Sequence, residues 1–240
     1  MSWHAKPSGG YAEYSQENED NALEVNGILN GYGFSSESQI GILANAQHEG
    51  GMNPWRLQGP DSPNWTPASG YGLFQYTPAW QYFEGCADFP GYGPNTTIYE
   101  TLPTARPEDG YAQTIALAED SLQKWHLNPL NGGWSEAEFP YFFQLCREGL
   151  QLYGSGNLIT LEQFKLVDNP NYATALFLGC FERPERPNVS ARLSSVPYFA
   201  SVVSPDTPVP PPPEPGPGPS PSGSQFMFMF YLKPKWKRGF

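Results

Sequence analysis

Cysteine is scarce in this chain of 240 residues, which contains three cysteines at widely separated positions. Their odd number and the lack of any C-x-x-C pair argue against a disulfide framework and against a zinc site. Histidine is equally rare, and no H-E-x-x-H motif is present, so a zinc peptidase is not expected. The residues are Cys86, Cys146 and Cys180, with His4, His48 and His126. We therefore expect neither a metal ion nor a cofactor.

Basic residues are also few, with 13 Lys and Arg against 24 Asp and Glu and a net charge of −11. Four of these cations lie in the last eight residues, which leaves nine cations and a net charge of −15 over residues 1–232. Contacts with phosphates dominate the affinity of proteins for nucleic acids, so this acidic body argues against a DNA or RNA ligand. The same charge argues against a body that lies flat on an anionic bilayer.

Long apolar runs are missing as well. The longest, residues 226–232, has seven residues, whereas a membrane span needs roughly 20. The first 20 residues contain no apolar core of the kind found in secretory signals. We therefore expect synthesis in a cytoplasm, without a signal for export.

Proline and glycine divide the chain into four parts. Residues 1–18 are polar and are expected to form a flexible N-terminal lead-in, and residues 19–203 have the mixed composition of a folded domain. Residues 204–223 contain 10 prolines and are expected to form a semi-rigid linker. Residues 224–240 form a tail that is first apolar and then basic.

Helical patterns dominate residues 19–203. Asp20 or Asn21 is expected to cap a first helix, and Ser36 with Gln39 forms a capping box for a second helix that ends at Gly50. Further helices are expected over 108–126, from 169 to the residues before Pro184, and over 189–201 with an interruption near position 197. Residues 70–76 are the best candidate for a short extended segment. The predicted fold class is mainly α (α+β), with a small β-element or loop.

Glu49 is the first candidate catalytic residue. It closes the second predicted helix, near the line of Ile42 and Ala46 on its apolar edge. Partial burial and the negative end of the helix dipole both favour a protonated carboxyl, which a general acid must supply. From its position alone, an ordinary surface glutamate at a helix end is the favoured interpretation.

A second block, G-Y-G-L-F-Q-Y-T at residues 70–77, follows 21 residues after Glu49. Its glycines allow a ligand to approach the backbone, its polar side chains offer hydrogen bonds, and its rings can stack on sugars. Trp55 offers a further ring between the two motifs. The candidate substrate-binding residues are Trp55, Gly70, Tyr71, Gln75, Tyr76 and Thr77.

The helix that ends in Glu49, the following Asn53-Pro54 and the block at 70–77 together resemble the phage tail lysozyme domain family. This family includes the tail-knob wall-degrading protein of short-tailed bacteriophages. The resemblance extends over most of residues 20–203 and includes Glu182-Arg183-Pro184 and Arg192. It implies a lysozyme-like fold and cleavage of the β-1,4 bond between N-acetylmuramic acid and N-acetylglucosamine. It also places the catalytic glutamate at Glu49 and the block at 70–77 on the wall of the glycan groove.

The second catalytic group stays open. Asp61 is the nearest downstream carboxylate and could orient water or support the oxocarbenium ion, but it also suits a turn beside Pro60. The acetamido group of the substrate could assist instead, and attack by the sugar 6-hydroxyl would make the enzyme a lytic transglycosylase. We expect a structural role for Glu182 and Arg183, in which one or the other pairs with a group inside the protein.

The resemblance implies a virion-borne muramidase, made in the host cytoplasm, that opens the bacterial cell wall locally during genome entry. Peptidoglycan is the expected substrate, and residues 224–240 are expected to bind a phage tail or virion protein; contact of this tail with a membrane is the alternative. Two other functions remain open. One is an endolysin or conjugation-associated lytic transglycosylase, and the other is a catalytically silent structural or glycan-binding tail protein.

Overall fold

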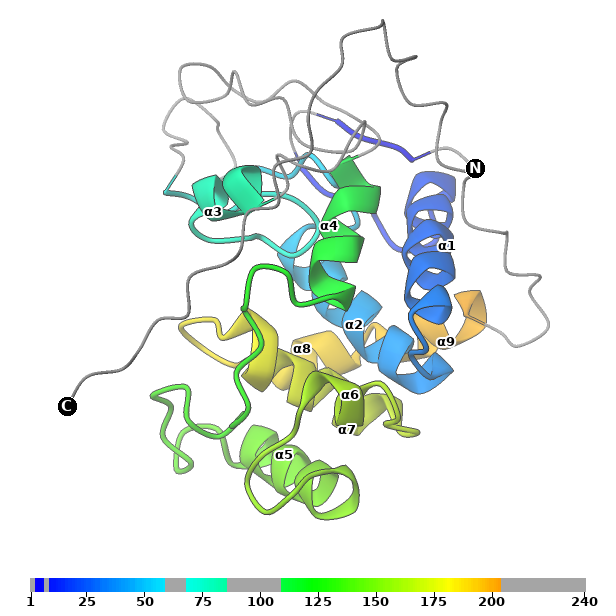
Figure 1. Ribbon diagram of the computed structural model, residues 1–240. Helices are drawn as coiled ribbons and strands as arrows, with labels where there is room; N and C mark the ends of the chain where they lie inside the picture. Colours follow the sequence, from blue (N-terminus) through cyan, green and yellow to red (C-terminus); the bar gives the residue numbers. More distant parts are fainter. Residues whose placement is uncertain (1–2, 7–8, 59–67, 86–108, 204–240) are drawn as a thin grey trace, which may run out of the picture.

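The computed structural model describes residues 3–6, 9–58, 68–85 and 109–203 and confirms the predicted mainly α class (Figure 1). Helix α2 lies in the middle of the fold and packs against α1, α7, α8 and α9, while α4 packs on α1 and α5 on α7. The described helices include none with the length and apolar content that a membrane span needs. In chain order the helices are α1 (Gln16–Gly31), α2 (Ser36–Glu49), α3 (Ala79–Gly85), α4 (Asp109–Ala118), α5 (Pro140–Tyr153), α6 (Leu161–Phe164), α7 (Pro170–Phe177), the π-helix Leu178–Glu182, α8 (Val189–Leu193) and α9 (Val196–Val202).

Helices α2 and α7 approach each other closely at Gly41. A Cβ atom at this position would lie 2.6 Å from the Cβ of Ala173 and 2.7 Å from the backbone nitrogen of Thr174, so the contact requires glycine. One turn further along α2, the buried Asn45 amide donates hydrogen bonds to the carbonyls of Gly41 and Thr174, at 2.8 and 3.0 Å. These contacts fix the helix that carries Glu49 at its end.

The C-terminal end of α2 rests on the backbone of residues 70–77. Gly50 caps the helix, and a Cβ atom there would lie 2.6 Å from the carbonyl oxygens of both Gly72 and Leu73. The absence of a side chain at Gly50 therefore allows the two motifs that carry the family resemblance to meet in space. Glu49 is placed beside the glycine-rich block by this contact.

Residues 70–77 form a tight turn. Tyr71 makes isolated antiparallel bridges with Leu57 and with Tyr76, and the backbone N–H groups of Tyr71 and Tyr76 donate to each other's carbonyls at 3.2 and 2.9 Å. Between them, Gly72 has a φ of 84°, which glycine adopts readily. The described residues contain isolated bridges and no longer strand, so the predicted β-element is not confirmed there.

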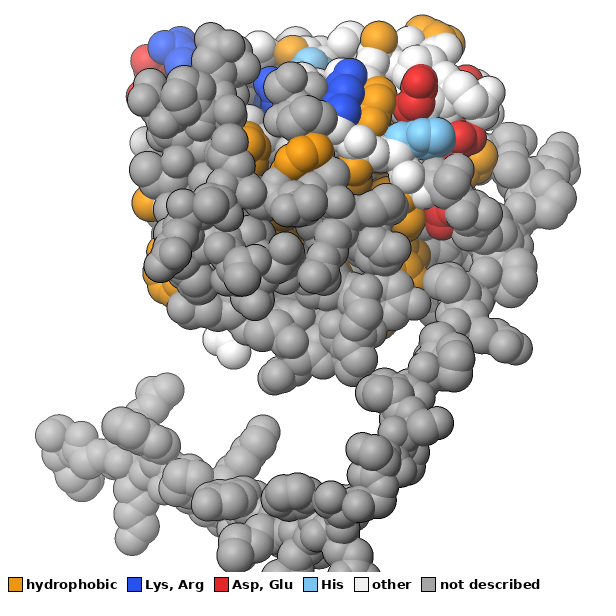
Figure 2. Space-filling view, turned by 90° about the horizontal axis from the view of Figure 1, so that it is seen from above, with side chains coloured by type: hydrophobic (Ala, Val, Ile, Leu, Met, Phe, Trp, Pro, Cys, Tyr) orange, Lys and Arg blue, Asp and Glu red, His pale blue; other side chains and the backbone are white. Residues whose placement is uncertain are grey.

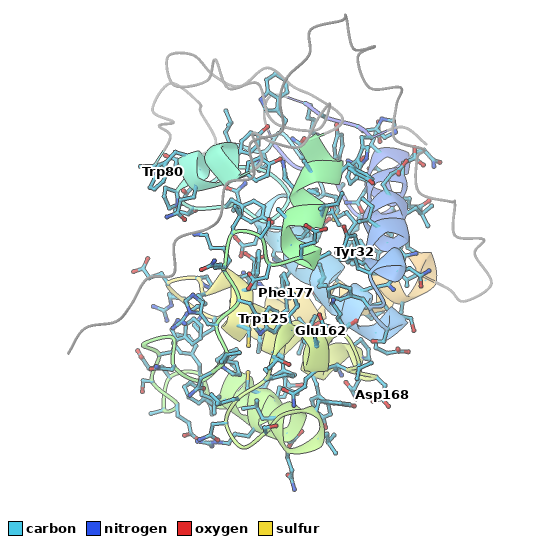
Figure 3. All side chains as sticks on the ribbon, in the orientation of Figure 1. Tyr32, Trp80, Trp125, Glu162, Asp168 and Phe177 are labelled. Carbon is cyan, nitrogen blue, oxygen red and sulfur yellow. The ribbon has the colours of Figure 1, made fainter. Side chains whose placement is uncertain are left out.

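Aromatic rings fill the interior between α7 and the segment after α4 (Figure 3). The ring of Phe177 lies 6.4 Å from Trp125, 6.0 Å from Phe164 and 4.9 Å from Phe181, measured between ring centroids. Phe74, from the turn at 70–77, lies 6.4 Å from Phe177. One aromatic cluster therefore anchors the turn and the π-helix to the same core.

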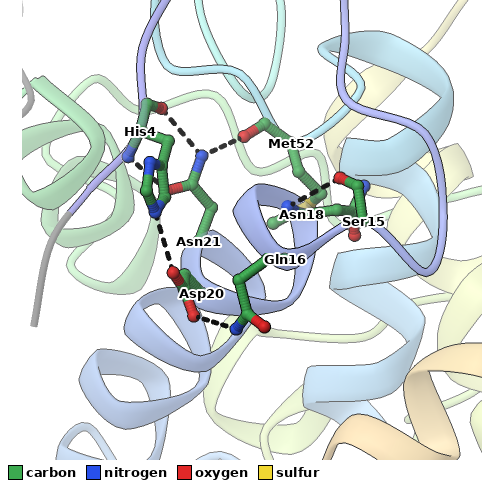
Figure 4. Close-up of polar contacts among 7 residues, drawn as sticks. All are labelled: His4, Ser15, Gln16, Asn18, Asp20, Asn21 and Met52. Carbon is green, nitrogen blue, oxygen red and sulfur yellow. Dashed lines mark hydrogen bonds and ion pairs between the residues drawn. The ribbon is translucent and has the colours of Figure 1, made fainter.

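The described N-terminal residues are tied to α1 and to the loop after α2 (Figure 4). The His4 ring lies 2.8 Å from the Asp20 carboxylate, which also accepts a hydrogen bond of 2.8 Å from Gln16. Asn21 donates to the carbonyls of His4 and Met52 at 2.8 and 2.6 Å. Helix α1 begins inside the segment 1–18 that we expected to be a lead-in.

The start of α1 differs from the prediction. Its N-cap is Ser15, whose hydroxyl accepts a hydrogen bond of 3.2 Å from the backbone N–H of Asn18. Asp20 and Asn21 were predicted as caps, but they lie within the helix, and their side chains bind the N-terminal segment instead. Asp and Asn side chains can either cap a helix or bind groups elsewhere in the chain, and here the contacts with the N-terminal segment decide between these two roles.

The start of α2 is shifted by one residue. Ser35, rather than Ser36, is the N-cap and accepts a hydrogen bond from the backbone of Ser38 at 3.0 Å. The predicted capping box is wrong, because the buried Gln39 amide donates to the carbonyl of Phe34 at 2.7 Å. The helix ends at Glu49 and is capped by Gly50, as predicted.

Later helices agree with the prediction in part. Asn169 caps α7 as predicted, and the last predicted helix is divided into α8 and α9. Helix α4 ends at Ala118 rather than near position 126, because the chain turns at Asp120, which has a φ of 48°. Helix α5 was not predicted; it begins at Pro140, in the first helical turn, where proline is well tolerated.

Candidate active site

A cavity of about 570 Å³ opens beside the C-terminal end of α2. Its walls come from α2 and the segment after it, the turn at 70–77, the segment after α4, and the end of the π-helix with the residues that follow. Five separate parts of the chain therefore meet at one site. The ionisable lining residues are Glu49, Arg56, Lys124, His126, Glu182, Arg183 and Glu185.

Glu49 lies at the cavity wall as the last residue of α2, and its side chain is 20 % exposed. Its carboxylate forms an ion pair with the guanidinium of Arg192 from α8, which is 7 % exposed. Arg192 is held in turn by a hydrogen bond of 3.3 Å to the carbonyl of Asn188. The sequence pattern contained no sign of this ion pair, because Arg192 lies 143 positions after Glu49 in the chain.

Three of the predicted substrate-binding residues, Gln75, Tyr76 and Thr77, line the cavity. Gln75 has a φ of 44°, an uncommon conformation for a residue other than glycine, and its amide donates to the carbonyls of Arg56 and Gly72 at 3.0 and 2.9 Å. The turn is therefore held in a strained shape by its own side chain. Such strain is found at functional sites, which makes this wall a candidate for ligand contact.

The other predicted binding residues lie elsewhere. Tyr71 is fully buried, and its ring stacks on Tyr82 with a centroid distance of 5.8 Å. Gly70 is buried next to it and donates a hydrogen bond of 2.6 Å to Gln58. Trp55 is partly buried against the hydrophobic core and is not among the residues that line the cavity. The structure thus places Gly70 and Tyr71 behind the wall that Gln75, Tyr76 and Thr77 form, and it leaves Trp55 outside the cavity lining.

Asp61, the predicted second carboxylate, lies outside the described residues. Glu182 is a carboxylate that the structure brings to the same cavity as Glu49, although it lies 133 positions later in the chain. Glu182 ends the π-helix, and the next residue, Arg183, has a φ of 46°. We expected a structural role for Glu182. A glutamate two positions before a proline carries no sequence signal that distinguishes a cavity residue from a buried structural one.

The environment of Glu182 is unusual. Its atom Oε1 is buried and has no hydrogen-bond partner among the described residues. Burial raises the pKa of the Glu182 carboxyl well above its usual value, and the nearby charge of Glu49 raises the pKa further, while Arg192 opposes both. A carboxyl in these surroundings is neutral at pH values where ordinary glutamates are ionised.

Basic groups line another part of the cavity. Lys124 donates a hydrogen bond of 3.0 Å to the carbonyl of Thr77, and burial lowers the pKa of its amine. Burial also lowers the pKa of His126, as do the neighbouring charges of Arg183 and Lys124. His126 is therefore neutral near pH 7 and can accept a hydrogen bond from a polar ligand.

The chemistry available at this site is that of carboxylic acids and hydrogen bonds. Within the described part of the chain, no three His, Cys, Asp or Glu side chains gather as ligands for a metal ion. On the face seen in Figure 2, the described Lys and Arg side chains lie among acidic and histidine side chains. Two carboxyls in a polar cavity, one of them neutral, are the groups that hydrolysis of a glycoside requires.

Comparison with known proteins agrees with this chemistry. The sequence model of one family, described as phage tail lysozyme, matches residues 20–198. A search of curated proteins found no match. The matched region begins in α1, ends in α9 and includes every described element that lines the cavity. This chain therefore belongs to the phage tail lysozyme family and is a phage-associated, lysozyme-like hydrolase of peptidoglycan.

Proposed function

We propose that the protein is a muramidase that cleaves the β-1,4 bond between N-acetylmuramic acid and N-acetylglucosamine, with Glu49 as the general acid. The observation that carries this proposal is the position of Glu49. It is a partly exposed carboxyl at the end of α2, in a cavity whose other lining residues offer polar and aromatic groups. Family membership supports the substrate class.

In this proposal, Glu49 donates a proton to the oxygen of the leaving sugar as the bond to the anomeric carbon breaks. Gln75, Tyr76 and Thr77 contact the glycan along the wall, and Gly70 and Tyr71 support them from behind. Positive charge that develops on the muramic ring is stabilised by a second carboxylate, for which Asp61 remains a candidate, or by the acetamido group of the substrate. Water completes the hydrolysis.

The test is digestion of purified peptidoglycan by the full-length chain, with products identified by mass spectrometry. The wild type is compared with Glu49→Gln, which keeps the shape of the side chain but cannot donate the proton. Glu162→Gln is the matched control, because Glu162 is 79 % exposed on α6 and does not line the cavity (Figure 3).

We expect reducing muramic ends from the wild type and from the control, and a loss of at least about 100-fold in Glu49→Gln. Anhydro-muramic ends would instead identify a lytic transglycosylase that acts at the same bond. Unchanged cleavage by Glu49→Gln would contradict the assignment of the acid. If walls from several hosts are left intact by the wild type, the catalytically silent tail protein becomes the better explanation.

The same proposal includes the setting of the activity. We propose that the enzyme is carried in the virion, opens the host wall locally during genome entry, and is held in the particle by residues 224–240. The apolar run 226–232 lies beyond a linker with 10 prolines, so an adhesive segment is separated in sequence from the catalytic domain. Such a segment suits addition to a partner protein better than exposure to water.

A further inference from the structure

Glu182 presents a problem that a purely structural role does not explain. An ionised carboxylate is costly to bury without hydrogen bonds, and a residue needed only for packing would be better replaced by an apolar one. Yet Glu182 has a buried Oε1 atom that makes no hydrogen bond with any described residue. The residue is also held by uncommon backbone geometry, since it ends a π-helix and precedes a left-handed Arg183.

Two described charges, those of Glu49 and Arg192, act electrostatically on Glu182. Two carboxyls therefore share one guanidinium. Arg192 pairs with Glu49, while its own Nε atom is buried and has no hydrogen-bond partner among the described residues. A donor and an acceptor, Arg192 Nε and Glu182 Oε1, are thus both left unpaired in the same neighbourhood.

Glu49, Glu182 and Arg192 form a trio of interacting charged groups. The net charge of this trio determines how many protons it holds. With both carboxyls ionised, the trio would carry a net charge of −1 in a largely buried place, whereas one bound proton makes it neutral. Protons on such strongly interacting groups belong to the set rather than to one residue. Glu49 forms the ion pair with Arg192, whereas Glu182 is buried with an Oε1 atom that has no hydrogen-bond partner among the described residues, so Glu182 is the favoured site for that proton.

We propose that Glu182 is a positioning residue that holds the proton used by Glu49, and that Arg192 couples the two carboxyls into a single unit with one proton. This inference rests on the proposed function. When the glycan binds, the Glu182 proton passes to Glu49, and Arg192 exchanges its ion pair with Glu49 for one with Glu182. Glu49 then gives that proton to the glycosidic oxygen. After hydrolysis, the proton released by the attacking water restores the neutral trio.

Other ionisable groups around the cavity bear on the same equilibrium. His48 lies next to Glu49 on α2, and its pKa is lowered by burial and by Arg192. The remaining groups that line the cavity are Arg56, Lys124, His126, Arg183 and Glu185. Lys124 and His126 both have pKa values that burial lowers, so their charges also change with pH. The tests therefore compare variants at each pH rather than interpret a single profile.

The first experiment is the pH dependence of peptidoglycan cleavage by full-length wild type, Glu182→Gln and the control Glu162→Gln. In Glu182→Gln, the alkaline limb of the profile is expected to move to lower pH by about one unit or more. Cleavage at pH 7 then falls about tenfold or more, while cleavage at the acidic optimum is retained. An alkaline limb at the wild-type position would overturn the proposal and leave Glu182 with a structural role.

The second experiment needs neither catalysis nor a folded Glu182→Gln protein. Infrared spectroscopy at pH 7 detects the carbonyl band of neutral carboxyls in the wild type and in Glu49→Gln. We expect the Glu182 band to disappear in Glu49→Gln, because Arg192 is then free to pair with an ionised Glu182. Burial also raises the pKa of Glu24, so any Glu24 band is common to both proteins and cancels in the difference.

A band that persists in Glu49→Gln would show that the two carboxyls titrate independently, and it would overturn the inference. This outcome is distinct from failure of the proposed function, which would appear as a wild type without muramidase products. The infrared result stands in either case.

Discussion

The contact between Gly50 and the turn at 70–77 yields a prediction for Gly50→Ala. The backbone angles of Gly50, φ −104° and ψ −12°, are accessible to alanine, so the substitution introduces no backbone strain. The added Cβ atom would lie 2.6 Å from two carbonyl oxygens and 2.8 Å from the Cα of Leu73. Cβ contacts shorter than 3.0 Å are essentially never observed, so the turn must move by at least 0.4 Å.

We expect this overpacking to lower the free energy of unfolding by about 1–3 kcal/mol, because both obstructing groups are backbone atoms that cannot rotate away. In a domain of this size, that corresponds to a fall in Tm of very roughly 2–4 °C per kcal/mol. Cleavage should fall as well, since Gln75 and Thr77 are displaced relative to Glu49, and small misplacements reduce rates strongly.

Gly31→Ala is the matched control. Gly31 is the last residue of α1, and no atom lies within 4 Å of a Cβ placed there. Alanine at such a site is expected to raise stability by about 0.4–1 kcal/mol, because it restricts the unfolded chain. Urea denaturation of both variants measures the difference. If Gly50→Ala proves as stable and as active as Gly31→Ala, the close contact between α2 and the turn does not exist as described.

Two further predictions concern the ends of the chain. Partial burial alone would raise the pKa of Asp20, but hydrogen bonds from Gln16 and His4 lower this pKa on balance. The contribution of Asp20 to stability is therefore present above the pKa of the unfolded state and is lost as the pH falls through the lower pKa of the folded state. Asp20→Asn should therefore lower the free energy of unfolding by about 0.2–1 kcal/mol at pH 7, and urea titrations should show this difference shrinking as the pH falls below about 3.9, the usual pKa of an unfolded aspartate. Deletion of residues 224–240 should abolish incorporation into phage particles, measured by immunoblot of purified virions, while peptidoglycan digestion by the soluble protein is retained. Normal incorporation of the deletion variant would refute the docking role of this tail.

Local sequence patterns identified several elements correctly. The cap at Asn169, the end of α2 at Glu49 and the glycine after it follow from short-range hydrogen bonding and backbone preference, which act within a few residues. The mainly α class follows from the same short-range rules. Patterns failed where a side chain had two possible partners. Asp20 and Gln39 were predicted to cap helices, but their partners in the structure come from tertiary contacts.

The sequence by itself therefore determined the mainly α class, several of the helices, the acidic body and the two motifs that carry the family resemblance. Only the tertiary structure decided which carboxyl lies beside Glu49. Glu182 and Arg192 lie 133 and 143 positions after Glu49 in the chain, and they reach it because α8 and α7, which continues into the π-helix, both pack against α2. Burial and electrostatic coupling depend on distance through space. Spacing along the chain cannot reveal them, and for this reason Glu182 looked like an ordinary structural residue until its surroundings were known.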